Sequence, residues 1–395
     1  MQCSARMQAV QLPIIPLITE WIRETPNTIS LGQGVVSYPP PPEATEQMHS
    51  FLRETANHKY QPGQGIPELV ALVEAKLKSE NQIDAPCASE VFITAGANMA
   101  FTYAVLAVTD PGDEVILQLP YYFNHEMAVA MAGCKPVCVP TDGDYQLEPQ
   151  RIRRAINKRT RAVVTISPNN PTGAVYPASV LSEVNAICAQ HGLYHISDEA
   201  YENFTFDGVQ HFSPGSISAA GDHTISLFSL SKAYGFAGWR IGYMAVPRHL
   251  IMSIRKIQDT ILICPPVASQ WAAVGALKVG SQYCRQRIQA IDEARHLMWR
   301  RLRCAGDVLR GPKSSGAFYF FMRVVAELDS VALAEDLIRR CRVAVVPGAT
   351  FGVREGCSLR ISYGALDGAT AIEGTDRLVA GLRDLIRANS RSASP

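Results

Sequence analysis

The 395-residue chain lacks an excess of charge of one sign, a long apolar run and any paired-cysteine motif. Its 37 Lys and Arg residues balance 36 Asp and Glu residues, and the net charge of +1 gives no electrostatic basis for binding nucleic acid or an anionic membrane. No apolar run reaches the length of a membrane span. The 10 cysteines are scattered and include no Cys-x-x-Cys pair, so we expect reduced thiols and a cytoplasmic protein.

Motifs of several other protein classes are missing as well. Neither a Gly-x-Ser-x-Gly elbow nor a phosphate-binding P-loop is present. Residues 32–34 (Gly-Gln-Gly) come nearest to a dinucleotide fingerprint, but they lie near prolines rather than directly after a strand. His191 and His195 have the spacing of zinc ligands on a helix, but Gly192 separates them at a turn, so we expect no metal site.

The length of the chain and its 47% apolar composition are typical of a globular protein with two domains. Its middle part alternates helix-like segments with short apolar runs that end in polar or glycine-rich turns. This alternation predicts an α/β domain with a mostly parallel sheet. The predicted strands are residues 91–94, 114–118, 161–166, 193–197, 224–228 and 239–246.

The remaining segments predict a second, α+β domain. Residues 285–304 have the pattern of a long amphipathic helix that bridges to it. We expect the proline-rich N-terminal segment to wrap back onto this domain, and we expect the Ser/Arg-rich tail, residues 387–395, to be frayed. The predicted strands of the second domain are residues 317–323, 344–346 and 358–363.

Polar side chains follow four successive strands of the predicted α/β domain. In an open α/β sheet, ligands bind beyond the carboxyl ends of the strands, so these side chains are expected to meet. The small residues after the first strand open a helix, where backbone N–H groups can approach a phosphate. In chain order the candidates are Gly96, Ala97, Asn98, Asn170, Asp198, Glu199, Tyr201, Ser229, Ser231 and Lys232.

Lys232 carries the most informative chemistry. It leaves a strand into a glycine-rich turn, where a partly dry environment lowers the pKa of an amine and makes it a nucleophile for a carbonyl. Ser229, Ser231 and Arg240 would suit a phosphate. An amine next to a phosphate site is what pyridoxal 5'-phosphate (PLP) requires. Taken alone, the segment is more often a strand end with a solvated lysine, and the joint occurrence of the other residues favours the PLP interpretation.

Together these segments resemble the class I/II aminotransferases of PLP fold type I, the superfamily of aspartate and aromatic aminotransferases. The resemblance extends from about residue 30 to 365 in the order and spacing of that family. The matching segments are YQPGQGIPEL (60–69), DPGDEV (110–115), SPNNPTG (167–173), SDEAY (197–201), SLSK (229–232) with Arg240, and LRISY (359–363).

The resemblance implies a role for each candidate in PLP binding. Lys232 would hold PLP as an aldimine and then move the proton, Asp198 would pair with the pyridine nitrogen, and Tyr122 would stack on the ring. Asn170 and Tyr201 would bind the ring hydroxyl. Tyr60 would reach the phosphate bound by the other subunit of a homodimer. The residues expected at the phosphate are Gly96, Ala97, Asn98, Ser229, Ser231 and Arg240.

The resemblance also implies a substrate site. Arg360 would bind the substrate α-carboxylate, and Gly34 would line the substrate with its backbone. The family often has Gly-x-Pro-Asp-Phe where this chain has residues 34–38 (Gly-Val-Val-Ser-Tyr), and some aspartate-accepting relatives have a lysine where this chain has Asn98. We therefore expect a neutral or aromatic L-amino acid as donor, not aspartate, and a 2-oxo acid as acceptor in a ping-pong mechanism.

The implied architecture is a large PLP-binding domain, residues 46–285, with a mixed, mostly parallel seven-stranded sheet between helices. Residues 1–45 and 286–395 would form the smaller α+β domain. Two alternatives remain open on the sequence alone. One is another PLP reaction, by a β-lyase or a 1-aminocyclopropane-1-carboxylate synthase-like enzyme. The other is a non-catalytic PLP-binding regulator, but such proteins usually add a DNA-binding domain, and no basic helix-turn-helix pattern is present.

Overall fold

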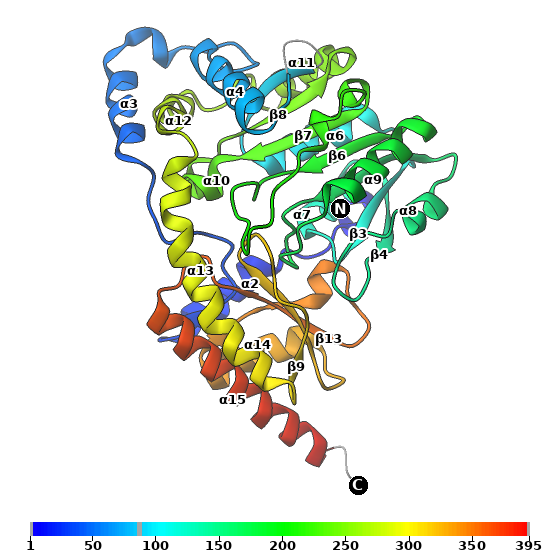
Figure 1. The fold of residues 1–395 in the computed structure, drawn as a ribbon, viewed down its shortest axis with the longest axis vertical. Coiled ribbons are helices and arrows are strands. Elements are labelled where there is room, and N and C mark those ends of the chain that lie inside the picture. The colour runs from blue at the N-terminus through cyan, green and yellow to red at the C-terminus, as the bar shows by residue number, and fades with distance from the viewer. Residues whose placement is uncertain (1–2, 85–88, 393–395) are drawn as a thin grey trace.

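The structure, a computed structural model, describes residues 3–84 and 89–392. Two lobes are joined by the long helix α13 (Gln282–Leu302), which runs along one side of the molecule (Figure 1). The boundary predicted between residues 285 and 286 falls inside this helix. Within the described residues, no helix combines the length and the apolar character needed to cross a membrane.

The large lobe contains a seven-stranded sheet in the order β2-β8-β7-β6-β5-β3-β4. Strand β8 runs antiparallel to both of its neighbours, and the other pairs are parallel, which confirms the predicted mixed, mostly parallel sheet. The strands are β2 (Ser89–Thr94), β3 (Glu114–Leu119), β4 (Lys135–Pro140), β5 (Thr160–Ile166), β6 (Tyr194–Asp198), β7 (Thr224–Ser229) and β8 (Gly242–Pro247).

Helices cover both faces of this sheet, which explains why its central strands are almost continuously apolar. Leu117 of β3 points into a core with Phe101, whereas the adjacent Ile116 packs with Leu181 on the opposite face. The helices of this lobe are α3 (Pro42–Arg53), α4 (Pro67–Glu80), α6 (Ala97–Val108), α7 (Phe123–Met131), α8 (Pro149–Ala155), α9 (Ala178–His191), α10 (Leu230–Ala233), α11 (Ile251–Leu262) and α12 (Val267–Val279).

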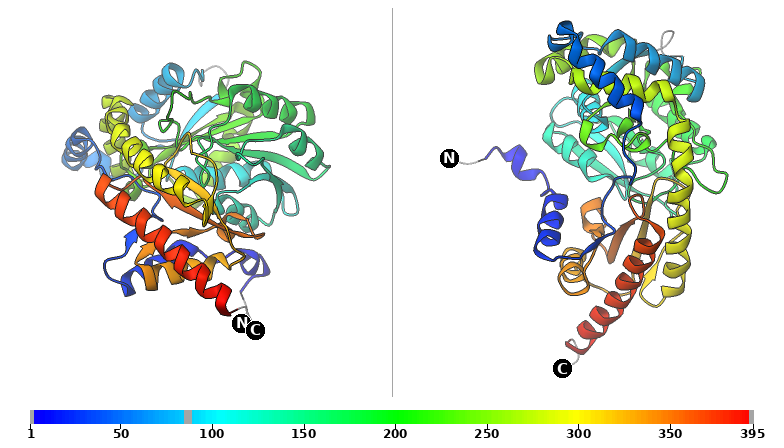
Figure 2. Two further views of the ribbon diagram at one scale, coloured as in Figure 1. Left: turned by 60° about the horizontal axis from the view of Figure 1, so that its bottom comes forward. Right: turned by 90° about the vertical axis from the view of Figure 1, so that its left-hand side faces the viewer.

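The small lobe is built from the two ends of the chain, as predicted. Its four-stranded antiparallel sheet has the order β12-β13-β10-β9. Near the N-terminus, β1 (Ile29–Ser30) pairs in parallel with β11 (Val343–Ala344), and helix α2 (Ile14–Glu24) lies beside this lobe (Figure 2). The other elements of this lobe are β9 (Leu309–Arg310), β10 (Tyr319–Val324), α14 (Ser330–Cys341), β12 (Val346–Pro347), β13 (Cys357–Ser362) and α15 (Gly368–Ser392). Helix α1 (Ala5–Ala9) packs instead against α7 of the large lobe.

Several details differ from the sequence-based expectations. Residues 344–346, expected as one strand, are divided between β11 and β12, and the short strands β1 and β9 were not predicted. Strand β8 begins at Gly242 rather than at residue 239, because Ala237–Trp239 form a 3-10 turn before it. Strand β4 was not predicted, since its two prolines and exposed edge position weaken the strand pattern. Residues 387–392 of the tail are not frayed, because they continue helix α15 to Ser392. Residues 393–395 lie outside the described part of the chain.

A buried arginine ties the bridging helix to both lobes. The guanidinium of Arg295 on α13 donates to Asp207 of the large lobe at 2.8 and 2.9 Å, and to the backbone oxygen of Ser314 at 2.8 Å. Lys313 also donates to Asp207 at 2.9 Å. The hydrogen bonds from Arg295 and Lys313 hold the pKa of Asp207 well below its usual range, although partial burial opposes this effect.

We predict that Arg295→Met lowers the stability of the protein by about 2 kcal/mol, the order of a hydrogen bond to a charged group. The methionine retains the packing but removes the hydrogen bonds that Arg295 donates to Asp207 and Ser314, while the one from Lys313 to Asp207 remains. Urea unfolding followed by circular dichroism measures the change. Arg301→Met is the control, since Arg301 lies on the same helix in a solvent-exposed pair with Asp376 and should matter little. Equal midpoints for the two variants would contradict the prediction.

Candidate active site

A cavity of about 120 Å³ lies at the carboxyl ends of the central strands. It brings together ten of the residues selected from the sequence, contributed by the loops and helices that follow β2, β3, β5, β6 and β7. The predicted residues that line it are Ala97, Asn98, Tyr122, Asn170, Asp198, Tyr201, Ser229, Ser231, Lys232 and Arg240. Its other lining residues are Ile166 and Ala200.

Lys232 lies in α10, a helix of one turn that begins directly where β7 ends. The Ser229 side chain caps this helix by accepting from the backbone N–H of Ser231 at 3.1 Å. The Lys232 amine donates to the backbone oxygen of Gly34 at 2.5 Å. Burial, together with the charges of Arg360 and Arg240, lowers the pKa of Lys232 to about 8, while Asp198 acts in the opposite direction. The amine is therefore available as a nucleophile and base near neutral pH.

One end of the cavity is built to bind an anion. Gly96 caps the start of α6 with φ of +83°, and a Cβ atom at this position would lie only 2.6 Å from a terminal nitrogen of Arg240. Glycine therefore lets the guanidinium approach the helix start, where the first backbone N–H groups have no partner within the helix. Ser229 and Ser231 add hydroxyl donors to the same cavity.

The other end of the cavity contains a buried carboxylate. Asp198 ends β6, and its Oδ1 accepts from the backbone N–H of Ala200 at 3.0 Å. Its Oδ2 lies 3.0 Å from Nε2 of His125, which is buried on α7 and stacks on Phe101 with the ring centroids 3.8 Å apart. Sequence analysis missed His125. The available signal was its position three residues after Tyr122, in the first turn of the helix that follows β3.

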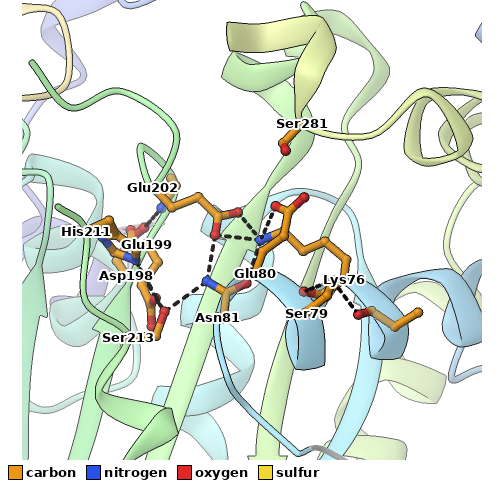
Figure 3. A network of polar contacts seen from close by, with 12 residues as sticks. Lys76, Ser79, Glu80, Asn81, Asp198, Glu199, Glu202, His211, Ser213 and Ser281 are labelled. Atoms are coloured by element: carbon orange, nitrogen blue, oxygen red, sulfur yellow. Dashed lines mark hydrogen bonds and ion pairs between the residues drawn. The ribbon is translucent and has the colours of Figure 1, made fainter.

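A buried polar network lies next to Asp198 in the chain (Figure 3). The carboxylate of Glu199 accepts from Ser213 at 2.5 Å and lies 2.9 Å from Nε2 of His211. Asn81 then connects Ser213 to Glu202, which also pairs with a lysine of α4. Because Asn81 and that lysine belong to the α4 region, the network fixes the loop after β6 to a helix distant in sequence.

A second, larger cavity of about 420 Å³ adjoins the first, and the two share Tyr122, Asn170, Tyr201 and Lys232. Gly34 and Arg360 line it, as the resemblance implied. Residues of α2 and Tyr319 also line it, and none of these was predicted. The α2 residues are Ile15, Ile18, Thr19 and Ile22.

Arg360 is buried between the two sheets. Its Nη1 donates to Oδ1 of Asn170 at 3.0 Å and its Nη2 donates to the backbone oxygen of Gly32 at 2.7 Å. The guanidinium lies over the rings of Tyr319 and Phe351, 4.5 and 5.2 Å from their centroids. Its Nε is buried without a hydrogen-bond partner among the described residues, so the site retains a donor for a ligand.

Three of the candidate residues lie outside both cavities. Glu199 belongs to the buried network described above. Gly96 shapes the anion end but does not line it. The side chain of Tyr60 is 80% exposed and contributes to neither cavity within one chain.

The site is thus an amine between the groups that could hold an anion and a carboxylate, next to a cavity with a buried arginine. Comparisons with known proteins identify the family. The family model described as "Aminotransferase class I and II" matches residues 26–378. The chain therefore belongs to the class I and II aminotransferases, which confirms the resemblance and the assignment as an enzyme. Enzymes of this family depend on PLP.

The individual relatives carry different substrate names. The aromatic aminotransferase ISS1 of Arabidopsis thaliana is 33% identical over 393 residues, which cover 97% of each protein. The aspartate aminotransferase of Pyrococcus abyssi is 34% identical over 366 residues, 91% of this chain and 92% of that protein. A single mutant of Thermus thermophilus aspartate aminotransferase has a TM-score of 0.88 at 32% identity, covering 97% of this chain and 100% of that structure.

We predict that Lys232 in the cofactor-free protein reacts with a small amine-directed reagent with a pH midpoint near 8. The pKa of an ordinary lysine is about 10.4. Arg360→Gln should raise the midpoint because it removes a neighbouring positive charge, whereas Asp198→Asn should lower it because it removes a negative one. Mass spectrometry of the modified site at each pH measures the three profiles. Midpoints that move in the same direction in both variants would be incompatible with this account.

Proposed function

We propose that the chain is a PLP-dependent aminotransferase that moves an amino group between a neutral or aromatic L-amino acid and a 2-oxo acid by a ping-pong mechanism. The observation that carries the proposal is the placement of the Lys232 amine, with its lowered pKa, between a carboxylate and an anion cradle. When bound, PLP supplies the electron sink for the negative charge that develops at the substrate Cα.

The residues present fit PLP. The helix start at Gly96, Ala97 and Asn98, with Arg240, would hold the phosphate, and Asp198 would pair with the pyridine nitrogen. A carboxylate buried at this end of the cavity keeps a nearby ring nitrogen protonated. Ser229 and Ser231 would add hydroxyl donors to the phosphate, Tyr122 would pack on the ring, and Asn170 and Tyr201 would bind its hydroxyl.

Lys232 and Arg360 supply the chemistry and the orientation that belong to the protein. With a pKa of about 8, Nζ of Lys232 can accept a proton from the substrate Cα and return it without a large energetic cost at neutral pH. Arg360 would bind the substrate carboxylate, since its planar fork matches a carboxylate and its Nε has no other partner among the described residues.

We also propose that the chain acts in the cytoplasm and divides into a cofactor-binding domain, residues 46–285, and a small domain, residues 1–45 and 286–395. The pairing of β1 with β11 supports the assignment of the N-terminal segment to the small domain. Every cysteine that the structure describes is a free thiol, as expected in a reducing compartment, and Cys87 lies outside the described residues.

We propose that the chain forms a homodimer, in which the exposed Tyr60 would contact the phosphate site of the other subunit. The Tyr60 side chain is 80% exposed, and other large apolar side chains, Leu52 and Ile263, are also exposed, at 59% and 43%. Such exposure suits a surface that another subunit covers. In that arrangement Tyr60 would complete the phosphate site of its neighbour.

The walls of the second cavity support a neutral or aromatic donor. Ile15, Ile18 and Ile22 present apolar surface from α2, and the positively charged residues that line this cavity are Lys232 and Arg360. Both already have partners in the proposed chemistry. A second carboxylate, as in aspartate, would therefore lose water without gaining a counter-charge within the chain.

We predict that Lys232→Ala removes the visible absorption of the lysine-bound cofactor and slows turnover by roughly a hundred- to ten-thousandfold, the usual contribution of a positioned acid–base group. Absorption spectra and steady-state transamination assays of the purified protein measure both effects. Lys135→Ala, which changes an exposed lysine on edge strand β4, is the matched control and should behave as wild type. Undiminished turnover by the Lys232 variant would overturn the proposed function.

We predict a higher kcat/KM for phenylalanine or leucine than for aspartate. Thr19→Arg places a cation on the wall of the second cavity and should shift the preference toward aspartate by about tenfold, equivalent to roughly 1.4 kcal/mol. Thr19→Gln is the control because it adds length without charge. Conversion of the bound cofactor by each amino acid, followed by absorption, measures the donors directly. A wild-type preference for aspartate would refute the donor assignment and leave the reaction class intact.

A further inference from the structure

Tyr319 lies where the two lobes meet, and neither the sequence motifs nor the chemistry above gives it a role. It is the first residue of β10 in the small lobe and is completely buried. Its hydroxyl oxygen lies 2.7 Å from that of Tyr201, which belongs to the loop after β6 in the large lobe. A Cβ atom at Gly34 would approach the Tyr319 hydroxyl to 2.7 Å, so the phenol also explains the glycine at that position.

The directions of the hydrogen bonds around Tyr201 follow from Arg360. A guanidinium can only donate, so the Asn170 atom that faces Arg360 at 3.0 Å is the amide oxygen. The amide nitrogen of Asn170 then faces Tyr201 and donates to its hydroxyl at 3.3 Å. A hydroxyl has one proton and two acceptor positions. If Tyr319 also donates, the Tyr201 oxygen accepts twice and its own proton remains available to the cavity.

Backbone contacts of the residues just before Tyr319 help to fix its position. The N–H of Ala317 donates to the oxygen of Phe204 at 2.9 Å, and the N–H of Gly316 donates to the oxygen of Gly173 at 2.8 Å. Ala317 adopts φ of +51°, in the left-handed region, which turns the chain into β10. The strand start is therefore attached to two loops of the large lobe, one of which carries Tyr201.

Both phenols remain protonated near neutral pH and can therefore act as donors. Burial raises the pKa of Tyr319 to about 12 and raises the pKa of Tyr201 well above 10. The other groups that face the pair are Tyr122, which acts in the same direction, and Arg360, which opposes it. Lys232 lines the same cavity.

We infer that Tyr319 is a positioning residue, whose hydroxyl donates to the Tyr201 oxygen and so directs the Tyr201 proton into the cavity, toward the anionic ring oxygen of the cofactor. This inference rests on the proposed function. A hydroxyl that accepts hydrogen bonds is a stronger donor in turn, because hydrogen bonds in a chain polarise one another. Tyr319, which belongs to the small lobe, would thus influence the charge on the ring oxygen of the cofactor through Tyr201, without touching the reacting atoms.

Tyr319→Phe tests the inference in the PLP-bound enzyme. A weaker Tyr201 hydrogen bond stabilises the anionic ring oxygen less, so the pH midpoint of the visible absorption should rise, by roughly half to one unit. Tyr201→Phe should raise the midpoint further. In the double variant, loss of Tyr319 should add nothing, since its effect passes through Tyr201. Spectrophotometric pH titration of the four proteins gives the complete cycle.

Tyr363→Phe is the matched control. Tyr363 is equally buried in the small lobe and its hydroxyl lies 2.8 Å from that of Ser314, but it lines neither cavity. This variant should lose thermal stability comparably and keep the wild-type midpoint. An unchanged midpoint in Tyr319→Phe, or additive shifts in the double variant, would overturn the inference while the proposed function stands. A wild-type protein that binds no PLP would overturn both.

Discussion

The site depends on an excess of positive charge in two largely buried cavities. Lys232 lines both cavities, Arg240 and the carboxylate of Asp198 line the first, and Arg360 lines the second. Burial disfavours the charged form of the Lys232 amine, and the nearby charges of Arg360 and Arg240 add to this effect, so its pKa falls. The same excess of positive charge would favour anions at both ends, which is why we propose the phosphate near Arg240 and the substrate carboxylate near Arg360. The rest of the fold serves to keep these groups apart and oriented.

The part of this site that the sequence predicted is the part that local chain geometry determines. Parallel strands bring their carboxyl ends to one edge, so Asn170, Asp198 and Lys232 could be placed together from strand order alone. His125 and Tyr319 escaped prediction because they reach the site through packing between elements remote in sequence. Helix α2 was missed for the same reason, since its isoleucines look like ordinary core residues until the chain folds back over the cavity.

One set of contacts between the lobes lies on a short stretch of chain. Residues 313–317 receive Arg295 from the bridging helix and exchange backbone hydrogen bonds with the loops around Gly173 and Phe204. Tyr319 follows two residues later, and Arg360 lies beside it on the paired strand β13. Arg360, the phenol pair and this attachment between the lobes are therefore neighbours in the structure. A change in the contacts between the lobes at residues 313–317 would therefore shift Tyr319 and Arg360, which are close to them.

The carbonyl of Gly34 makes a further contact between the two lobes. Gly34 follows a segment that belongs to the small lobe, where Leu31 hydrogen-bonds to the backbone of Ala344 and Ser362. Its oxygen nevertheless accepts from the amine of Lys232 in the large lobe. Condensation of a carbonyl compound with this amine would release water and remove two of the amine hydrogens, which would weaken the hydrogen bond to Gly34. The amine for which we propose the chemistry is thus also one of the contacts between the two lobes, and its covalent modification would change that contact.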